Sequence, residues 1–248
     1  SIETGAITQE NLDEWARINT ANLIQQSGIK VTPETKLVLQ NAITFAAKWQ
    51  EDFRQGGVLD DDFTWADGTI TRVKMMCSVR HAPYTVSDGW RGVRLDYTDG
   101  ELAAFVLIPD DDTEQAPLTT LRQAVTQLCR PNETMGRVAV ELPRFTVTSE
   151  KKLFELFDCI GLETNTQLKA MTDPPVMLTQ AMQQAIIVVD ERGTVVSAVT
   201  SGGMETGVSL YTEKPIEIIA NRPFYFIVGD VETGTPLFLS HIGDPKMA

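Results

Sequence analysis

Apolar residues recur at helical spacing in three stretches of the chain, at residues 9–27, at 117–129 and after Ser149. Gly28 is suited to end the first helix, and Gly161 the third, in which Ser149 is the expected N-cap. The apolar positions of these helices are Leu12, Trp15, Ile18, Leu23 and Ile24, then Leu118, Leu121, Val125 and Leu128, then Leu153, Leu156, Phe157 and Ile160.

Strand patterns fill most of the remaining chain. Residues 36–45 are mostly apolar, which predicts a long buried strand. Residues 63–109 alternate and contain three Asp-Gly dipeptides, which are typical of tight turns between antiparallel strands. The expected strands there are VKMMCSV, GVRLDY and LAAFVLIP, followed later by RVAVELPRFTVT and QQAIIVVDERGT. Residues 215–245 predict three closing strands, with the last hairpin turn at Glu232-Thr233-Gly234.

One segment fits neither pattern. Residues 194–215 are rich in Thr, Ser and Gly and carry no regular set of large apolar residues. A connection of this length is usually either functional or disordered. From composition alone, a solvated linker is the commoner explanation.

The composition excludes several classes of partner. The chain has 248 residues, with 34 Asp and Glu against 21 Lys and Arg, a net charge of −13. Such an acidic chain is a poor ligand for nucleic acid or for an anionic membrane. No apolar run reaches the roughly 18 residues of a membrane-spanning helix, and the first residues do not resemble a signal peptide. The compartment does not follow from these features.

Candidate chemistry of the enzymatic kind is sparse. The three cysteines, Cys77, Cys129 and Cys159, are widely spaced and are expected to be buried free thiols rather than a disulfide framework or a zinc site. The two histidines, His81 at an expected turn and His241 in an expected terminal strand, are expected to be structural or surface residues. A hydrolase remains the rival class, although no GxSxG, P-loop, GxGxxG or HExxH motif occurs. The acidic runs 60–62 and 110–112 are expected to be solvated turns, so no metal and no cofactor are predicted.

The ordered motifs of the chain resemble those of the serpins, the serine protease inhibitor superfamily. They are LVLQNAITFAAKW, GTITRVKMM, ELPRF, AIIVVDERGT, NRPFYFIV and PLFLSHIGDP, spread along nearly the whole sequence. The resemblance implies an α+β fold with large mixed β-sheets and surrounding helices, as a single domain over residues 1–248. It also implies that the N-terminal helical part of the family lies outside this chain, and that the protein would need it.

The family's mechanism is to expose a bait loop, here residues 191–215, that a protease cuts and that then inserts into the main sheet. Alternate residues after the hinge would face inward, and those up to Gly202 are small or medium and uncharged. The resemblance implies that the hinge consists of Glu191, Arg192, Gly193, Thr194, Val195, Val196, Ser197, Ala198 and Val199. Three valines stand where inhibitory members favour Ala, Ser or Gly, so a non-inhibitory carrier or chaperone-like role stays open.

The scissile bond is placed differently by two counts, one forward from the hinge and one backward from Asn221. The candidates are Thr206, Gly207, Val208, Leu210 and Tyr211. No Arg or Lys lies between Met204 and Thr212, which disfavours a trypsin-like target. A chymotrypsin-, subtilisin- or elastase-like serine protease fits better, and a cysteine protease is a further option.

A second set of residues is implied to control opening of the sheet: Asn41, Trp49, Arg144, Gln183 and Glu191. Gln183 stands where the family usually has His, and Gln can still donate a hydrogen bond to Asn41. Arg144 and Glu191 are expected on neighbouring strands, close enough to pair beside Trp49. The expected partner is therefore a target protease, and the expected state is a monomer with a tendency to polymerise.

Overall fold

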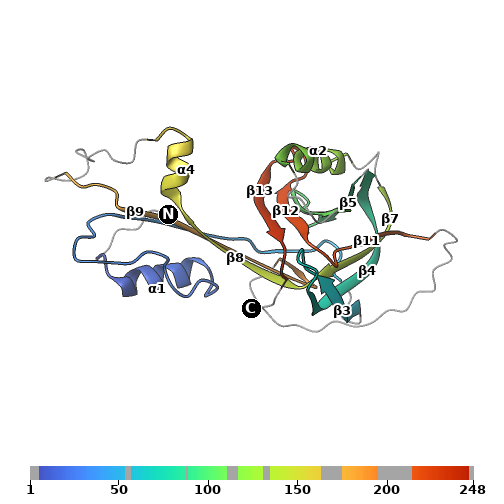
Figure 1. Ribbon diagram of the computed structural model, residues 1–248, viewed down its shortest axis with the longest axis horizontal. Coiled ribbons are helices and arrows are strands. Elements are labelled where there is room, and N and C mark those ends of the chain that lie inside the picture. Colours follow the sequence, from blue (N-terminus) through green and yellow to red (C-terminus); the bar gives the residue numbers. More distant parts are fainter. Residues whose placement is uncertain are drawn as a thin grey trace. The chain divides into compact units, whose positions relative to one another are not determined.

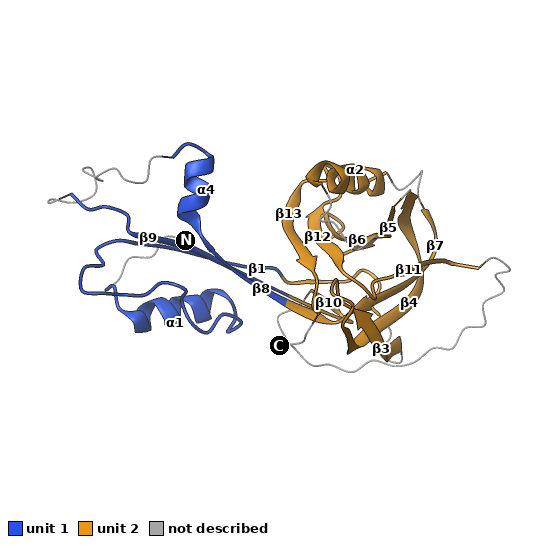
Figure 2. Cartoon of the chain, in the orientation of Figure 1, with its two compact units in different colours: residues 1–45, 147–187 blue, residues 46–146, 188–248 orange. Residues whose placement is uncertain are grey.

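The computed structural model describes residues 6–53, 57–87, 89–110, 117–130, 135–162, 175–194 and 214–245 (Figure 1). The chain divides into two compact units (Figure 2). Residues 1–45 and 147–187 form unit 1, and residues 46–146 and 188–248 form unit 2. Each unit therefore draws on two separate stretches of the sequence.

Unit 1 begins with helix α1, Gln9–Asn19, in which the Thr8 hydroxyl accepts a hydrogen bond from the Asn11 amide at 3.1 Å. The prediction of a helix to residue 27 is wrong. Ala21 and Asn22 have positive φ angles of 50° and 64°, so the chain leaves the helical conformation there.

A five-stranded sheet includes β1 (Val38–Thr44), β8 (Phe145–Lys152) and β9 (Gln180–Asp190). β1 runs parallel to β9, with Val38–Thr44 opposite Gln180–Ile186, and β8 also pairs with β9. The predicted strand at 36–45 exists but is not fully buried. No residue of β1 is fully buried and Leu39 is 45% exposed, because pairing with β9 satisfies backbone groups at one edge and does not cover the faces to which the side chains point.

Helix α4 spans Leu153–Cys159 and follows β8 directly. The prediction that Ser149 caps this helix is wrong, because Ser149 lies within β8 and Lys152 occupies the cap position without a side-chain hydrogen bond. Pairing of β8 with β9 extends the strand through a residue whose local preference is to begin a helix.

Unit 2 is built on an eight-stranded sheet in the order β11-β7-β4-β5-β6-β12-β13, with β3 paired to β4. β4 is long enough to pair with β3 and β7 over one part and with β5 over its last residues. The strands are β3 (Val58–Thr64), β4 (Ile70–Ser87), β5 (Trp90–Asp96), β6 (Leu102–Pro109), β7 (Met135–Pro143), β11 (Ile216–Ile219), β12 (Phe224–Asp230) and β13 (Pro236–Ile242).

Helix α2, Leu118–Leu128, packs on this sheet. Its Leu121, Val125 and Leu128 side chains are buried against Phe105 and Leu107 of β6, as the helical periodicity predicts. Leu118, the fourth predicted position, is exposed. Gly68 and Gly100 have φ angles of 82° and 74°, which confirms the two Asp-Gly turns between strands.

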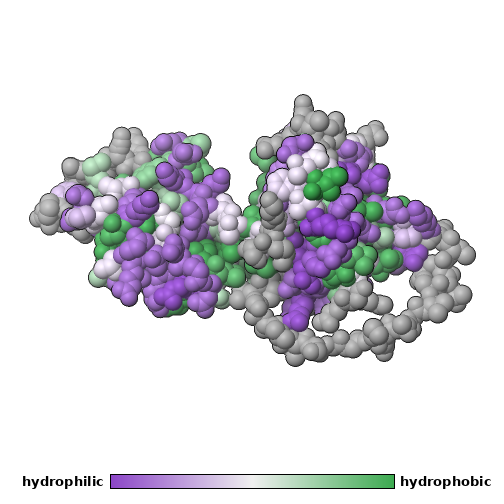
Figure 3. Space-filling view, turned by 60° about the horizontal axis from the view of Figure 1, so that its bottom comes forward, coloured by the Kyte–Doolittle hydropathy of each residue, from purple (hydrophilic) through white to green (hydrophobic). Residues whose placement is uncertain are grey.

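Two turn predictions in this unit are wrong. His81 lies exposed within β4, and the acidic run 60–62 lies within β3. Cross-strand pairing explains the second case, since Asp60 pairs with Lys74 at 2.9 Å and Asp62 with Arg72 at 3.5 Å. Leu59 and Ile70 are exposed apolar side chains of this unit. Figure 3 shows hydrophilic and hydrophobic residues side by side on the face that it presents.

All three cysteines are free thiols, but Cys159 is exposed and the other two are only partly buried, so the prediction of buried thiols is wrong in that respect. Within the described ranges, no helix is long and apolar enough to cross a membrane.

Candidate functional site

The end of β9 turns back within two residues to form a short strand, β10 (Gly193–Thr194). The Asp190 carboxylate accepts a hydrogen bond from the Arg192 amide at 2.8 Å, which stabilises the turn. Gly193 then pairs with Asp190, and Thr194 with Val189, in antiparallel register. The first four predicted hinge residues therefore form one hairpin.

β10 lies between two strands. It pairs with β9 on one side and with β2, Ala47–Lys48, on the other, antiparallel to both. β2 follows β1 after only two residues, yet β1 pairs with β9 directly. The residues predicted as the hinge therefore pair with β9 at Val189 and Asp190, whereas β1 pairs with β9 at Gln180–Ile186.

Gly193 is required by the closeness of β2. A Cβ atom at this position would lie 2.0 Å from the Ala47 carbonyl oxygen and 2.7 Å from the Lys48 Cα. The φ angle of 155° is also one that residues with side chains rarely adopt. Glycine therefore allows β10 to fit beside β2.

The backbone of residues 49–53 holds the hinge turn. The Trp49 amide donates to the Arg192 carbonyl, and the Phe53 amide to the Glu191 carbonyl, each at 2.9 Å. The Trp49 indole Nε1 donates to the Asp190 carbonyl, also at 2.9 Å. Both aromatic side chains are about 1% exposed, so these bonds are shielded from water.

Arg80 of β4 contacts residues 49–53 in two ways. Its Nη1 donates to the Glu51 carbonyl at 2.8 Å, and its guanidinium lies 4.4 Å from the centre of the Phe53 ring. Burial lowers the pKa of Arg80, because the charged form loses contact with water.

The predicted pair of Arg144 and Glu191 is confirmed. The Arg144 guanidinium contacts the Glu191 carboxylate through Nε and Nη2. Arg144 lies between β7 and β8 and Glu191 lies in the hinge turn, so the two meet where the strands end rather than within a ladder. The Glu191 side chain is 12% exposed and that of Arg144 is 34% exposed. Loss of either partner would leave the other charge unpaired in a partly buried site.

The hinge also makes a side-chain contact on its buried face. The Tyr97 hydroxyl lies 2.8 Å from the Thr194 hydroxyl, and neither residue is exposed. Burial raises the pKa of Tyr97 strongly, so its hydroxyl stays protonated.

In unit 1, Asn41 and Gln183 are opposite each other on β1 and β9. The predicted hydrogen bond is present at 3.3 Å, but Asn41 Nδ2 donates and Gln183 Oε1 accepts, the reverse of the expected direction. The neighbouring Gln184 is buried and donates to the Glu150 carboxylate at 2.8 Å and to the Gln26 carbonyl at 3.0 Å.

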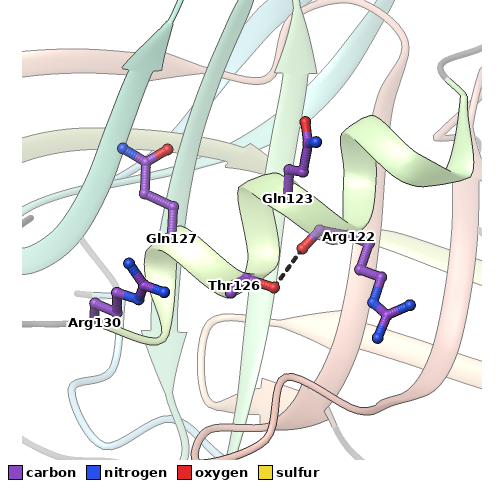
Figure 4. A pocket seen from close by; sticks show the side chains of 5 residues that line it. All are labelled: Arg122, Gln123, Thr126, Gln127 and Arg130. Atoms are coloured by element: carbon purple, nitrogen blue, oxygen red, sulfur yellow. Dashed lines mark hydrogen bonds between the residues drawn. The ribbon is translucent and has the colours of Figure 1, made fainter.

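A surface hollow of about 320 Å³ lies over α2 (Figure 4). Its lining comes from α2 and the residue shortly after it, and Thr126 Oγ1 donates to the Arg122 carbonyl at 2.8 Å within that helix. Its side chains are Arg122, Gln123, Thr126, Gln127 and Arg130. The part of the chain that the structure describes contains no group of three or more potential metal ligands.

The model of the family Serpin, serine protease inhibitor, matches residues 2–245. The chain belongs to the serpin family. Serpin-Z1C of Triticum aestivum is 27% identical over 258 residues, which cover 96% of this chain and 64% of the wheat protein. The fold is similar to that of the thermophilic serpin tengpin in its native state, with a TM-score of 0.74, 21% identity, and coverage of 97% of this chain and 64% of tengpin. It is also similar to thyroxine-binding globulin in complex with thyroxine, with a TM-score of 0.73, 19% identity, and coverage of 96% and 64%.

This serpin chain therefore spans about 64% of the length of the wheat relative and of tengpin. The implied α+β fold with large mixed sheets is confirmed by the structural similarity.

Much of the predicted bait loop lies outside the described residues of this serpin chain. These are Val195, Val196, Ser197, Ala198 and Val199 of the hinge and all five scissile-bond candidates, Thr206, Gly207, Val208, Leu210 and Tyr211. The residues predicted to control sheet opening fall into two groups, Asn41 with Gln183 in unit 1 and Trp49 with Arg144 and Glu191 in unit 2.

Three contributors to the hinge were not predicted from the sequence: Tyr97, Phe53 and Arg80. Each lies far along the chain from the residues that it contacts. A weak signal exists for Tyr97, which ends a predicted strand just before the Asp99-Gly100 turn, but the pattern does not indicate which residue its hydroxyl meets.

Proposed function

We propose that the protein inhibits a serine protease by offering a bait loop that is cleaved and then inserts into the five-stranded sheet. The observation that carries the proposal is the position of β10 between β9 and β2. Insertion would extend β10, a strand that is already in the sheet and that directly precedes residues 195–213.

The pairing of β1 with β9 indicates why insertion would lower the free energy of the protein. A loop that continued β10 would separate β1 from β9, which pair in parallel over Val38–Thr44 and Gln180–Ile186. It would replace that single parallel pair with two antiparallel pairs, since β10 is antiparallel to both β9 and β2. Antiparallel pairs are slightly more stable per residue, and a new strand also buries its inward side chains.

Residues 195–204 suit such a strand, because they include three valines and no charged side chain. The absence of Lys and Arg between Met204 and Thr212 favours a chymotrypsin-, subtilisin- or elastase-like target. In this account the chain contributes no enzymatic activity of its own, and the part of the protein outside this chain completes the fold.

The test is incubation of the full-length protein with a panel of serine proteases. We expect a complex that survives SDS with at least one protease, and a cut between Met204 and Thr212. Cleavage without a stable complex would support a non-inhibitory serpin, the second candidate, for which the fold similarity to thyroxine-binding globulin is the supporting observation. Release of hydrolysed peptide substrate by the protein alone would contradict both.

A further inference from the structure

We propose that Tyr97 is a positioning residue for the hinge, whose hydroxyl holds Thr194 in the sheet before any protease arrives. This inference rests on the proposed function for its consequence, though the contact itself can be tested without a protease. Tyr97 belongs to the stretch after β5, and Thr194 is the last described residue before the bait loop.

The two hydroxyl oxygens are 2.8 Å apart, and both residues are fully buried. Each hydroxyl can donate and each can accept, so one hydrogen bond gives both the Tyr97 and the Thr194 hydroxyl a partner. A hydroxyl that is buried without a hydrogen-bond partner is disfavoured, because it has lost its hydrogen bonds to water and gained none in the protein. The hinge therefore gains from keeping Thr194 at this place.

The Tyr97 ring is also held by contacts other than the one with Thr194. It stacks on Trp49 with the ring centres 4.8 Å apart and the planes within 7°. The Tyr97 amide donates to the Leu102 carbonyl at 3.2 Å, and the Thr98 amide to the Lys48 carbonyl at 2.9 Å. These contacts fix the position from which the Tyr97 hydroxyl meets Thr194.

The stacked pair of Trp49 and Tyr97 contacts both strands of the hinge hairpin. Trp49, on which Tyr97 stacks, donates through its indole to the Asp190 carbonyl before the turn. Tyr97 itself contacts Thr194 after the turn. The aromatic pair therefore fixes both strands of the hairpin, and the hydroxyl of Tyr97 is the part that acts on the inserting strand.

The consequence concerns the competition between insertion and release of the protease. With Thr194 held in the sheet, the cut loop continues an existing strand. Without the bond, the hinge withdraws from the sheet more often, and insertion starts later relative to deacylation. More inhibitor molecules are then cut without trapping a protease.

The test is Tyr97→Phe in the full-length protein, which keeps the ring and removes the hydroxyl. We expect amide exchange at residues 193–194 to become about tenfold faster, equivalent to about 1.4 kcal/mol. We also expect the stoichiometry of inhibition to rise about two- to fivefold, on the same order-of-magnitude reasoning. Tyr84→Phe is the matched control: it makes the same change in β4, where the ring lies against Gly136, and should alter neither measurement.

Thr194→Val probes the contact from the hinge side and serves if Tyr97→Phe folds poorly. The double variant Tyr97→Phe, Thr194→Val removes both hydroxyls, so that neither is left buried without the other, and exchange and stoichiometry should return toward the original values. Unchanged exchange in Tyr97→Phe, or additive losses in the double variant, would overturn the proposal. Absence of any stable protease complex with the unaltered protein would instead count against the proposed function, while the exchange measurements would still decide the role of Tyr97.

Discussion

Arg144 and Glu191 form an ion pair at the hinge, although 47 residues separate them in the sequence. Arg144 interrupts two strands, and its amide donates to the Lys74 carbonyl at 2.9 Å, which fixes it to β4. Glu191 lies in the turn whose carbonyl accepts from the Phe53 amide. The pair therefore joins the hinge turn to the body of unit 2.

Charge reversal at this pair should open the sheet. Glu191→Lys would place two cations together in a site where the Glu191 side chain is only 12% exposed. Breaking a buried pair by removing one partner costs roughly 3–5 kcal/mol, and partial exposure reduces this. We expect the loosened hinge to accept the loop of another molecule, so that the full-length variant forms polymers on warming, measured by native gels or light scattering.

Asp60→Lys is the control for that experiment, because Asp60 pairs with Lys74 where both side chains are more than half exposed. Exposed pairs contribute about 0–1 kcal/mol, so this variant should stay monomeric. A Glu191→Lys protein that remains monomeric under the same warming would refute the role given to the pair.

Gly193→Ala should displace the hinge strand. The added methyl group would lie 2.0 Å from the Ala47 carbonyl oxygen, so either β10 or β2 must move. We expect a loss of about 2 kcal/mol or more in local stability, seen as rapid amide exchange at residues 193–194. Gly243→Ala, where a Cβ meets nothing within 4 Å, should leave that exchange unchanged. Equal exchange in the two variants would contradict the tight fit.

Local patterns in the sequence predicted most strands of unit 2, because alternating apolar residues and Asp-Gly turns determine these elements within a few residues. The same reasoning failed at Ser149, which lies in β8, a strand that pairs with β9, instead of capping a helix. It also failed at residues 20–27, where two residues with positive φ angles end the helix early. The pair of Arg144 and Glu191 followed from family resemblance. The contact of Tyr97 with Thr194 did not, because it depends on how a turn after β5 meets a strand 97 residues later.

Thr194→Arg tests whether the hinge residue must be buried and uncharged. Thr194 is fully buried, so an arginine there would carry an unpaired charge into the sheet at a cost of about 3–5 kcal/mol. We expect the variant to be cut as a substrate, with no SDS-stable complex. Thr194→Ser keeps the hydroxyl and should still inhibit. Full inhibition by the arginine variant would rule out insertion through this position.

Glu141 gives unit 2 a pH dependence. Burial raises the pKa of this β7 carboxyl, and the charges of Asp61 and Glu217 raise it further. A pKa that is higher in the folded than in the unfolded state contributes stability below the unfolded value, and that stability is lost as pH rises through the folded value. Glu141→Gln should therefore raise the urea midpoint at pH 7 and leave it nearly unchanged near pH ~4. The exposed Glu232→Gln is the control, and a stabilisation that is equal at both pH values would contradict the assignment.

The melting temperature of the full-length protein before and after a single cut between Met204 and Thr212 tests the central claim most directly. If the loop inserts, the cut form gains a strand in the five-stranded sheet between β9 and the strands β1 and β2. We then predict that the melting temperature rises by well over the roughly 2–4 °C that 1 kcal/mol gives in a domain of 150–250 residues. A melting temperature that is equal or lower after the cut would contradict insertion and leave the loop as a segment without a mechanical role.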